Sequence, residues 1–231
     1  MDDKSKILEV LRSKSLTKQM IHDNTANVFT VLKTVLTEIA AEINHELSGL
    51  DQRILLEFKD NGKAEAQLRI AGDLLIFSMH SNVFEFNREH NIQKTSFAAQ
   101  NPLNTYCGII NIYNFLADSF KFNREEDLGY LIGRIFINRD FYYMVEGKGQ
   151  LAFTCNMLGT EKIDRAAIRK IVIGSIQYAL DFDLLVPPYD QVKIATVAQM
   201  IENIENSKMQ TGKRLGFVFN SDDINGVKNH R

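Results

Sequence analysis

The fold is decided by residues 53–86, RILLEFKDNGKAEAQLRIAGDLLIFSMHSNVFEF, in which side-chain polarity alternates with a period of two. Residues 54–59 and 64–70 place apolar side chains mainly on one face and charged side chains mainly on the other. Such alternation is typical of antiparallel strands that have one buried face and one face in water. We therefore predict that this stretch is a meander of antiparallel strands.

Short polar groups separate the predicted strands. Asp60-Asn61-Gly62 ends the first strand, and Asn-Gly readily supplies the positive φ angles of a tight hairpin. Ala71-Gly72-Asp73 turns the chain again, so that residues 74–80 form a third strand, and residues 83–86 a fourth.

A helix is predicted before the meander. Asp23 or Asn24 is placed to cap its start, and Gly49 stands where a left-handed C-terminal cap belongs. Its apolar stripe is Val28, Leu32, Val35, Ile39, Ile43 and Leu47. We expect this helix to lie across the dry face of the sheet. Residues 1–20 form an arm or a short helix.

The middle of the chain contains a polar, aperiodic segment and then more strands. Residues 87–104 lack periodicity, and long connections of this kind are often lids, binding loops or disordered segments. A second block of strands begins near Tyr106. Its predicted members are residues 108–113, 119–122, 130–137, 141–146 and 150–157.

Two helices are predicted near the C-terminus. Asp164 caps the first, with Ile163 and Ile168 placed to form a hydrophobic staple. Pro187-Pro188 ends it, and a second helix covers residues 190–207.

Strands and helices are thus segregated along the chain, which predicts an α+β fold: a large antiparallel meander sheet flanked by an N-terminal helix and two C-terminal helices. The domain organisation has three parts, namely the arm at 1–20, a single α+β domain over 21–212, and an edge strand and tail over 213–231. This layout is compatible with small secretion-chaperone-like domains and with helix-grip cavities that hold apolar ligands, as an analogy of layout only.

Composition excludes several classes of protein. A net charge of −2 and a pI near 6.2 argue against a sequence-independent nucleic-acid binder. The N-terminus lacks the order of a secretory signal, and no apolar run approaches the roughly 18 to 20 residues that span a bilayer. We predict a cytoplasmic protein with free thiols at Cys107 and Cys155 and with no membrane association.

Four motifs contain residue types that could carry chemistry, and each also has a simpler structural explanation. Gly147-Lys148-Gly149 lies between strands, so it is a hairpin turn rather than a phosphate loop. Glu57-Phe58-Lys59 matches the Glu-x-Lys strand of metal-dependent nucleases, but a solvated strand face explains it as well. A metal site at His80, Glu85, Glu89 and His90 and a nucleophile at Cys107 are the other two. An ordinary hairpin end is the favoured explanation for the His and Glu group, and a small core residue is the favoured explanation for Cys107.

The first-ranked site is a group of acids around the end of the predicted C-terminal helix. Asp181 and Asp183 fall where the helix macrodipole is already negative, and Asp190 follows beyond Tyr189. Negative charge at such a position is unfavourable. An arginine such as Arg134 or Arg139, a basic partner or a cation would offset this unfavourable interaction, and solvation by water is the alternative explanation. The predicted ligand- or partner-binding residues are Asp181, Asp183, Asp190, Tyr189 and Arg139.

These observations predict a non-enzymatic binding module with no cofactor and no catalytic residue. It acts through its antiparallel sheet and the 87–104 segment, as a homodimer, on an unidentified protein or an apolar small molecule. The alternative is a metal-dependent hydrolase of phosphoester or nucleotide substrates, which would use Asp181, Asp183 and Asp190, or Glu57 with Lys59.

Overall fold

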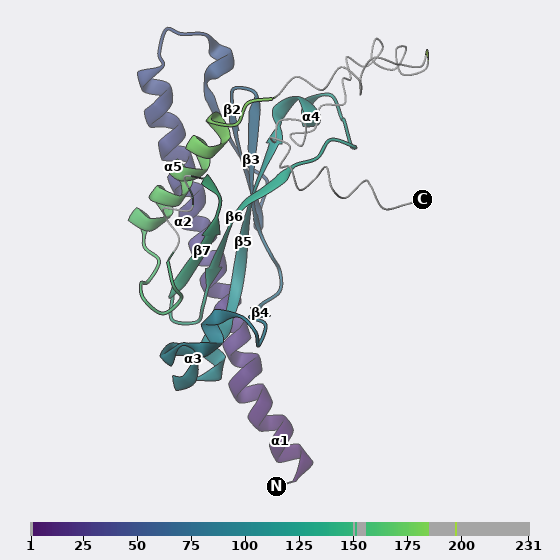
Figure 1. Ribbon diagram of the computed structural model, residues 1–231, viewed down its shortest axis with the longest axis vertical. Coiled ribbons are helices and arrows are strands. Elements are labelled where there is room, and N and C mark those ends of the chain that lie inside the picture. The colour runs from purple at the N-terminus through teal and green to yellow at the C-terminus, as the bar shows by residue number, and fades with distance from the viewer. Residues whose placement is uncertain (1, 150, 152–155, 185–196, 198–231) are drawn as a thin grey trace, which may run out of the picture.

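The computed structural model describes residues 2–149, 151, 156–184 and 197 (Figure 1). The predicted helix over 190–207 and the predicted edge strand and tail over 213–231 lie outside these residues, apart from residue 197. Most of the predicted strand over 150–157 also lies outside them.

A long helical rod forms the N-terminal part of the molecule. It comprises α1 (Asp3–Val10), a π-helical turn (Leu11–Ser15) and α2 (Leu16–Glu46), which follow one another without a break. The prediction that a helix starts at Asp23 or Asn24 is therefore wrong. Residues 11–24 contain neither glycine nor proline, so nothing in the backbone interrupts the helix there. Among the described residues, no helix combines the length and the apolarity that crossing a bilayer requires.

The predicted meander is confirmed as one antiparallel sheet of order β1-β2-β3-β5-β6-β7. The short strand β4 lies off this path and pairs with β5 alone. The strands are β1 (Leu56–Asp60), β2 (Glu65–Ile70), β3 (Asp73–Met79), β4 (Phe84–Glu85), β5 (Tyr106–Leu116), β6 (Tyr130–Ile137) and β7 (Tyr143–Gly147).

Two glycines adopt the positive φ angles that the sequence predicts, and one predicted strand is wrong. Gly62 has a φ of +102° between β1 and β2, and Gly49 has a φ of +89° after α2, as their positions suggested. The predicted strand over residues 119–122 is wrong, because Ala117–Lys121 is a short helix, α4. In this helix the Phe120 ring packs edge-on against Phe115 of β5, with centroids 5.3 Å apart.

Two helices close one face of the sheet, which we call the helix face. α5 (Arg165–Leu180) packs against α2, β2 and β3, while α2 crosses β1 and β5 (Figure 1). Asp164 caps α5 as predicted, accepting a hydrogen bond of 2.7 Å from the Ala167 amide. The predicted dry side of β2 is confirmed, since Ala66, Leu68 and Ile70 join the main core beneath these helices.

The second face of the sheet is covered over part of its area by residues 84–105. These residues contain β4, two 3-10 turns (Asn91–Lys94 and Pro102–Thr105) and α3 (Ser96–Gln100). Ile92 and Phe97 pack with Ile109, Phe136 and Met144 in a second apolar cluster. The segment predicted as a lid, loop or disordered stretch is therefore a folded cover over one end of the sheet (Figure 1).

Side-chain amides of two asparagines occupy the outer edges of the sheet. Asn44 exchanges two hydrogen bonds of 2.8 Å with the backbone of Leu56 on β1. Asn156 donates to the Tyr143 carbonyl and accepts from the Val145 amide of β7, both at 3.1 Å. Each amide imitates one residue of a further strand, so backbone pairing at these positions is already satisfied.

Candidate functional site

The acids at the end of α5 are on the surface. Asp181 is the C-cap residue of the helix, and both Asp181 and Asp183 are exposed. Tyr189 and Asp190 lie outside the described residues. The structure therefore places two of the predicted binding residues together at the helix end.

Arg139 is not near those acids. It lies in the turn between β6 and β7, where its guanidinium contacts Asp140 at 3.2 Å and the Asn104 side-chain oxygen at 3.3 Å. Its carbonyl accepts a 2.7 Å hydrogen bond from Asn24 on α2. This turn and the C-terminal end of α5 lie at opposite ends of the sheet (Figure 1), so the chain does not bring Arg139 to Asp181. A binding role for either residue stays a prediction.

The candidate metal ligands have other partners. In the described part of the chain, no group of three or more His, Cys, Asp or Glu side chains is arranged to hold a metal ion. Glu57 accepts two hydrogen bonds from Arg69, at 2.9 and 2.7 Å. Glu85 accepts a 2.5 Å hydrogen bond from the Tyr106 hydroxyl, and His90 accepts one from the Ile92 amide.

Cys107 is a buried residue of the second apolar cluster. The residue is 1% exposed, and burial raises the pKa of its thiol far above the ordinary value. A nucleophilic cysteine needs an accessible thiolate, so this environment is that of a small apolar core residue.

The part of the second face beyond residues 84–105 has a different character. Three rows of side chains cross it from strand to strand, as the register of the sheet fixes them. We call this surface the open half-face. Its rows are Glu57–Arg69–Leu74–Phe115, Lys59–Gln67–Ile76–Tyr113–Leu131 and Glu65–Ser78–Asn111–Arg134–Glu146.

Apolar side chains form the centre of the open half-face, where Leu74 and Ile76 are buried at 6% and 8% exposure, and ion pairs stand at two of its sides. Tyr113 and Phe115 are half-buried with ring centroids 6.4 Å apart, and Leu131 is 37% exposed. Arg69 pairs with Glu57 across β1 and β2. Arg134 pairs with Glu146 across β6 and β7, with a 3.0 Å hydrogen bond from Nε. The surface is thus an aromatic and aliphatic strip between two half-exposed charge pairs.

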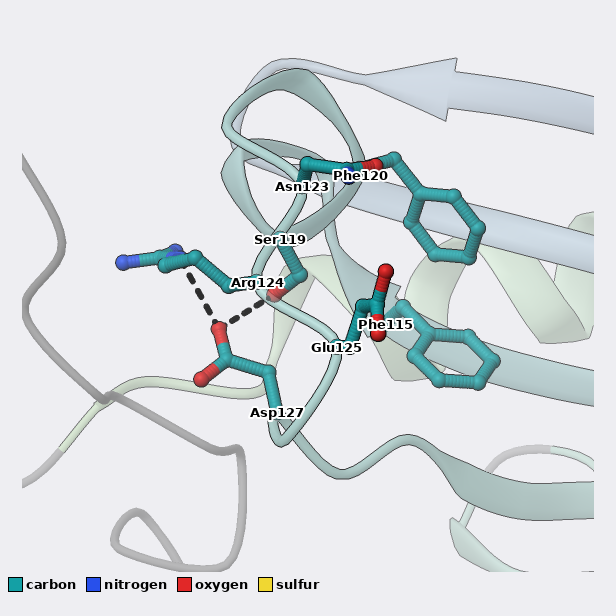
Figure 2. A pocket seen from close by; sticks show the side chains of 7 residues that line it. All are labelled: Phe115, Ser119, Phe120, Asn123, Arg124, Glu125 and Asp127. Atoms are coloured by element: carbon teal, nitrogen blue, oxygen red, sulfur yellow. Dashed lines mark hydrogen bonds and ion pairs between the residues drawn. The ribbon is translucent and has the colours of Figure 1, made fainter. Parts of the chain in front are cut away.

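A hollow of about 270 Å³ lies at one corner of the open half-face, beside α4 (Figure 2). The Phe115 and Phe120 rings line one side of it. The Ser119 hydroxyl donates a 2.6 Å hydrogen bond to Asp127, and Arg124 pairs with the same carboxylate at 3.0 Å. The Asp127 side chain is only 1% exposed, so this cluster holds the loop after α4 in place.

A larger hollow of about 750 Å³ lies on the other side of α4 and includes Arg69. Arg53 and Lys121 add positive charge to it, and Asp51 and Asp118 add negative charge. Arg53 binds Asp51 with both Nε and Nη2, which lowers the pKa of that carboxyl. Because its charges are of both signs, this hollow suits a surface of mixed charge better than a free anion.

The fold and this surface define an α+β protein with one closed and one partly open sheet face. Comparison of the chain with protein-family models, with curated proteins and with solved structures found no match in any of the three.

Sequence reasoning identified only part of the open half-face. The alternation in β1 and β2 placed Glu57, Gln67 and Arg69 on the wet side of the sheet, which the structure confirms. Phe141 and Tyr143, two aromatic residues of the predicted strand over 141–146, pack against the main core. Tyr113 and Phe115 were missed, although their i, i+2 spacing on a strand was a signal of a shared face.

Proposed function

We propose that this protein is a non-enzymatic binding module that holds an extended segment of a partner protein on the open half-face. The observation that carries the proposal is the set of three cross-strand rows, with apolar side chains at the centre and ion pairs at the sides. The folded cover over residues 84–105 and the helix α4 bound this surface at its two ends. The same module is proposed to act as a homodimer.

The spacing of the rows favours an extended segment as the occupant. Successive rows lie two residues apart along each strand, or roughly 6.7 Å. An extended chain repeats its side chains on one face with the same spacing, so each row meets one apolar or charged side chain of the partner. Pairs of opposite charge at both sides then favour a segment in which charged residues flank apolar ones.

An apolar small molecule is the less favoured occupant. The space between the helices and the sheet is filled by buried side chains such as Phe29, Leu68 and Phe77, each at most 1% exposed. The hollows described above lie on the surface and contain charged side chains. A ligand of helix-grip type needs an enclosed apolar cavity, which these hollows do not provide.

A library of random peptides of about 12 residues, displayed on phage, is the probe for this function. We expect selection against the full chain to enrich peptides with alternating apolar residues flanked by charges. Their dissociation constants, measured by fluorescence anisotropy, should rise at least about tenfold in a Tyr113→Ala, Leu131→Ala variant.

Ile173→Ala is the matched control, because Ile173 on α5 is 36% exposed and Leu131 is 37% exposed. It should leave peptide binding unchanged. Failure to enrich any peptide, or equal binding by the double variant, would contradict the proposal. The hydrolase alternative is tested separately by thermal melting with Mg²⁺, Mn²⁺ and Zn²⁺, where we expect no shift; stabilisation by one of them would favour it.

A further inference from the structure

The C-terminal part of the sequence contains a stretch with the pattern that the open half-face favours. In residues 213–219, KRLGFVF, the apolar side chains Leu215, Phe217 and Phe219 stand at every second position. These residues lie outside the described part of the chain. In an extended backbone, the three side chains fall on one side, roughly 6.7 Å apart, which is also the spacing of the rows on the sheet.

The stretch is preceded by positive charge. Residues 206–214 contain three bases and no acid, and Lys213 and Arg214 stand directly before the first apolar position. The next acids along the chain are Asp222 and Asp223. Charged residues therefore flank the apolar ones, with the bases at the end that is nearer to α5 along the chain.

The end of the open half-face beside α4 is acidic. Residues 117–127 contain four acids and two bases. Glu125 and Glu126 are exposed, and Glu125 lines the hollow at this corner (Figure 2). The C-terminal end of α5, which is followed by the exposed acids Asp181 and Asp183, lies at the same end of the sheet (Figure 1). Positive charge on an occupant is therefore favoured at this end.

The bases of the neighbouring larger hollow do not reverse this charge. Arg53 is paired with Asp51, and Arg69 is paired with Glu57. Each pair is neutral as a whole, so the excess of acids beside α4 remains.

The connection from α5 is long enough to bring the stretch to this surface. A flexible coil of the length of residues 185–212 has a root-mean-square span of roughly 30 Å. A strand of the length of β6 measures roughly 26 Å, so the whole half-face is within reach. Because α5 ends at the acidic end of the sheet, the basic residues of the stretch arrive there first.

We infer that residues 213–219 of the same chain occupy the open half-face as an extended segment that runs along the strands. Lys213 and Arg214 lie at the acidic end, and Leu215 and Phe217 lie on the two rows that contain Phe115 and Tyr113. This inference rests on the proposed function and names an occupant of the same surface. The segment competes with the partner protein, so partner binding requires its displacement.

Two other arrangements of the segment are less favoured. At the edges of the sheet, the Asn44 amide already pairs with Leu56 of β1, and the Asn156 amide pairs with Tyr143 and Val145 of β7. The same segment from a second copy of the chain has no tether. The tether holds the segment of the same chain at an effective concentration on the order of 1 mM.

Tryptophan fluorescence of the full chain tests the docking, because the natural sequence contains no tryptophan. We expect Phe217→Trp to emit at a shorter wavelength, and to be quenched less by acrylamide, than Val218→Trp, because neighbouring side chains of an extended segment point to opposite sides. Adding Tyr113→Ala with Leu131→Ala should remove this difference. Adding Ile173→Ala, on the exposed side of α5, should preserve it. Circular dichroism checks that each variant is folded.

The same measurement identifies the occupant and its place. The emission of Phe217→Trp should stay constant from about 1 to about 200 µM protein, since docking within one chain does not depend on concentration. A shift with concentration would mean that a second copy supplies the segment, and would overturn the inference. Equal quenching of the two tryptophans would also overturn it. So would shielding that survives Tyr113→Ala with Leu131→Ala, which would place the segment at another surface such as a sheet edge.

Charge reversal tests the role of the bases. Lys213→Glu with Arg214→Glu should increase the quenching of the tryptophan in Phe217→Trp, because the acidic end of the half-face then repels the segment. Lys228→Glu with Arg231→Glu makes the same change of charge further along the chain and should leave the quenching unchanged. Equal effects of the two reversals would contradict the proposed direction of the segment.

Relief of competition is the functional readout. With an effective concentration of about 1 mM and an intrinsic dissociation constant of about 100 µM, the segment weakens the binding of a competing peptide about tenfold. The full chain with Phe217→Ser and Phe219→Ser should therefore bind the selected peptides about tenfold more tightly than the natural sequence does. A fluorescein-labelled peptide of residues 210–223 should bind this variant, and Tyr113→Ala with Leu131→Ala should abolish that binding.

Failure of the inference and failure of the proposed function give different results. If Phe217→Trp is unshielded while selected peptides still require Tyr113 and Leu131, the half-face binds partners and the inference is wrong. If Tyr113 and Leu131 shield Phe217→Trp but no peptide binds even the variant with Phe217→Ser and Phe219→Ser, the docking stands and the proposed function is wrong.

Discussion

The two faces of the sheet are made by the same strands but are closed in different ways. On the helix face, α2 and α5 bury a continuous core that runs from Leu56 on β1 to Val145 on β7. On the second face, residues 84–105 cover one end, and no other described segment closes the rest in the same way. The helix face therefore holds the larger core, whereas the open half-face leaves Tyr113 and Phe115 half-buried and Leu131 exposed. The predictions below test this division.

The largest difference in the loss of stability is expected between alanine variants of Phe77 and Tyr113. Phe77 is fully buried on the helix face, while Tyr113 is half-buried on the open half-face. Phe77→Ala should lower the free energy of unfolding by about 3 to 5 kcal/mol, because it removes buried area and leaves a cavity. Tyr113→Ala should cost less than about 1 kcal/mol. Urea denaturation measures both, and equal losses would contradict a structural difference between the faces.

The second effect concerns a close approach between α2 and β5. A Cβ atom added at Gly108 would lie 2.0 Å from the Thr25 hydroxyl oxygen and 2.9 Å from its Cβ. Because Thr25 is on a helix and fully buried, it has little room to move. Gly108→Ala should therefore destabilise the fold by about 1 to 3 kcal/mol.

Two further variants make that measurement specific. Gly72→Ala has nothing within 4 Å of the new methyl group and should change stability by less than about 0.5 kcal/mol. Thr25→Ala combined with Gly108→Ala should recover part of the loss, since the hydroxyl is the nearest obstacle. Strictly additive losses in the double variant would show that the helix and strand are not in contact there.

These examples show what the sequence could predict and what it could not. Local signals worked where one residue acts on its own neighbours: Asp164 capped α5, and alternation placed Leu68 on the dry side of β2. They failed where a distant contact decides. Residues 117–121 form a helix, in which the Phe120 ring lies on Phe115 of β5, although the spacing of Phe120 from Phe122 is that of a strand.

The open half-face could not be predicted from the sequence for the same reason. Its rows depend on the pairing of β3 with β5, which sets Ile76 opposite Tyr113 after residues 80–105 have left and rejoined the sheet. No local pattern fixes that register. The predicted site at Asp181 and Arg139 joined residues that the fold sets at opposite ends, because charge alone does not indicate which elements meet.

The third prediction is a loss of stability at alkaline pH that arises on the helix side of the molecule. Burial raises the pKa of Tyr178 above its ordinary value of 10.0, and burial together with Glu161 raises that of Tyr143. Both groups hold their protons more tightly when the chain is folded. Their contribution is therefore fully present below pH 10 and is lost as the pH rises through the folded-state pKa values.

Urea denaturation between pH 8 and pH 11 measures this effect. The natural sequence should lose free energy of unfolding above about pH 10 more steeply than a Tyr143→Phe, Tyr178→Phe variant. Below about pH 9 the two slopes should coincide, because both tyrosines are then protonated in the folded chain and in the unfolded chain. Parallel curves over the whole range would show that the two phenols are as accessible in the folded chain as in the unfolded one.

The smallest effect is expected from the ion pair of Glu57 and Arg69 at the side of the open half-face. Both side chains are in contact with water, with exposed fractions of 66% and 37%. Water and salt screen such a pair, so a double-mutant cycle with Glu57→Gln and Arg69→Gln should give a coupling energy of about 0.2 to 1 kcal/mol. Raising the salt concentration should reduce it further. A coupling that is larger and insensitive to salt would mean that the pair is shielded from solvent, and hence that this half of the second face is closed like the first.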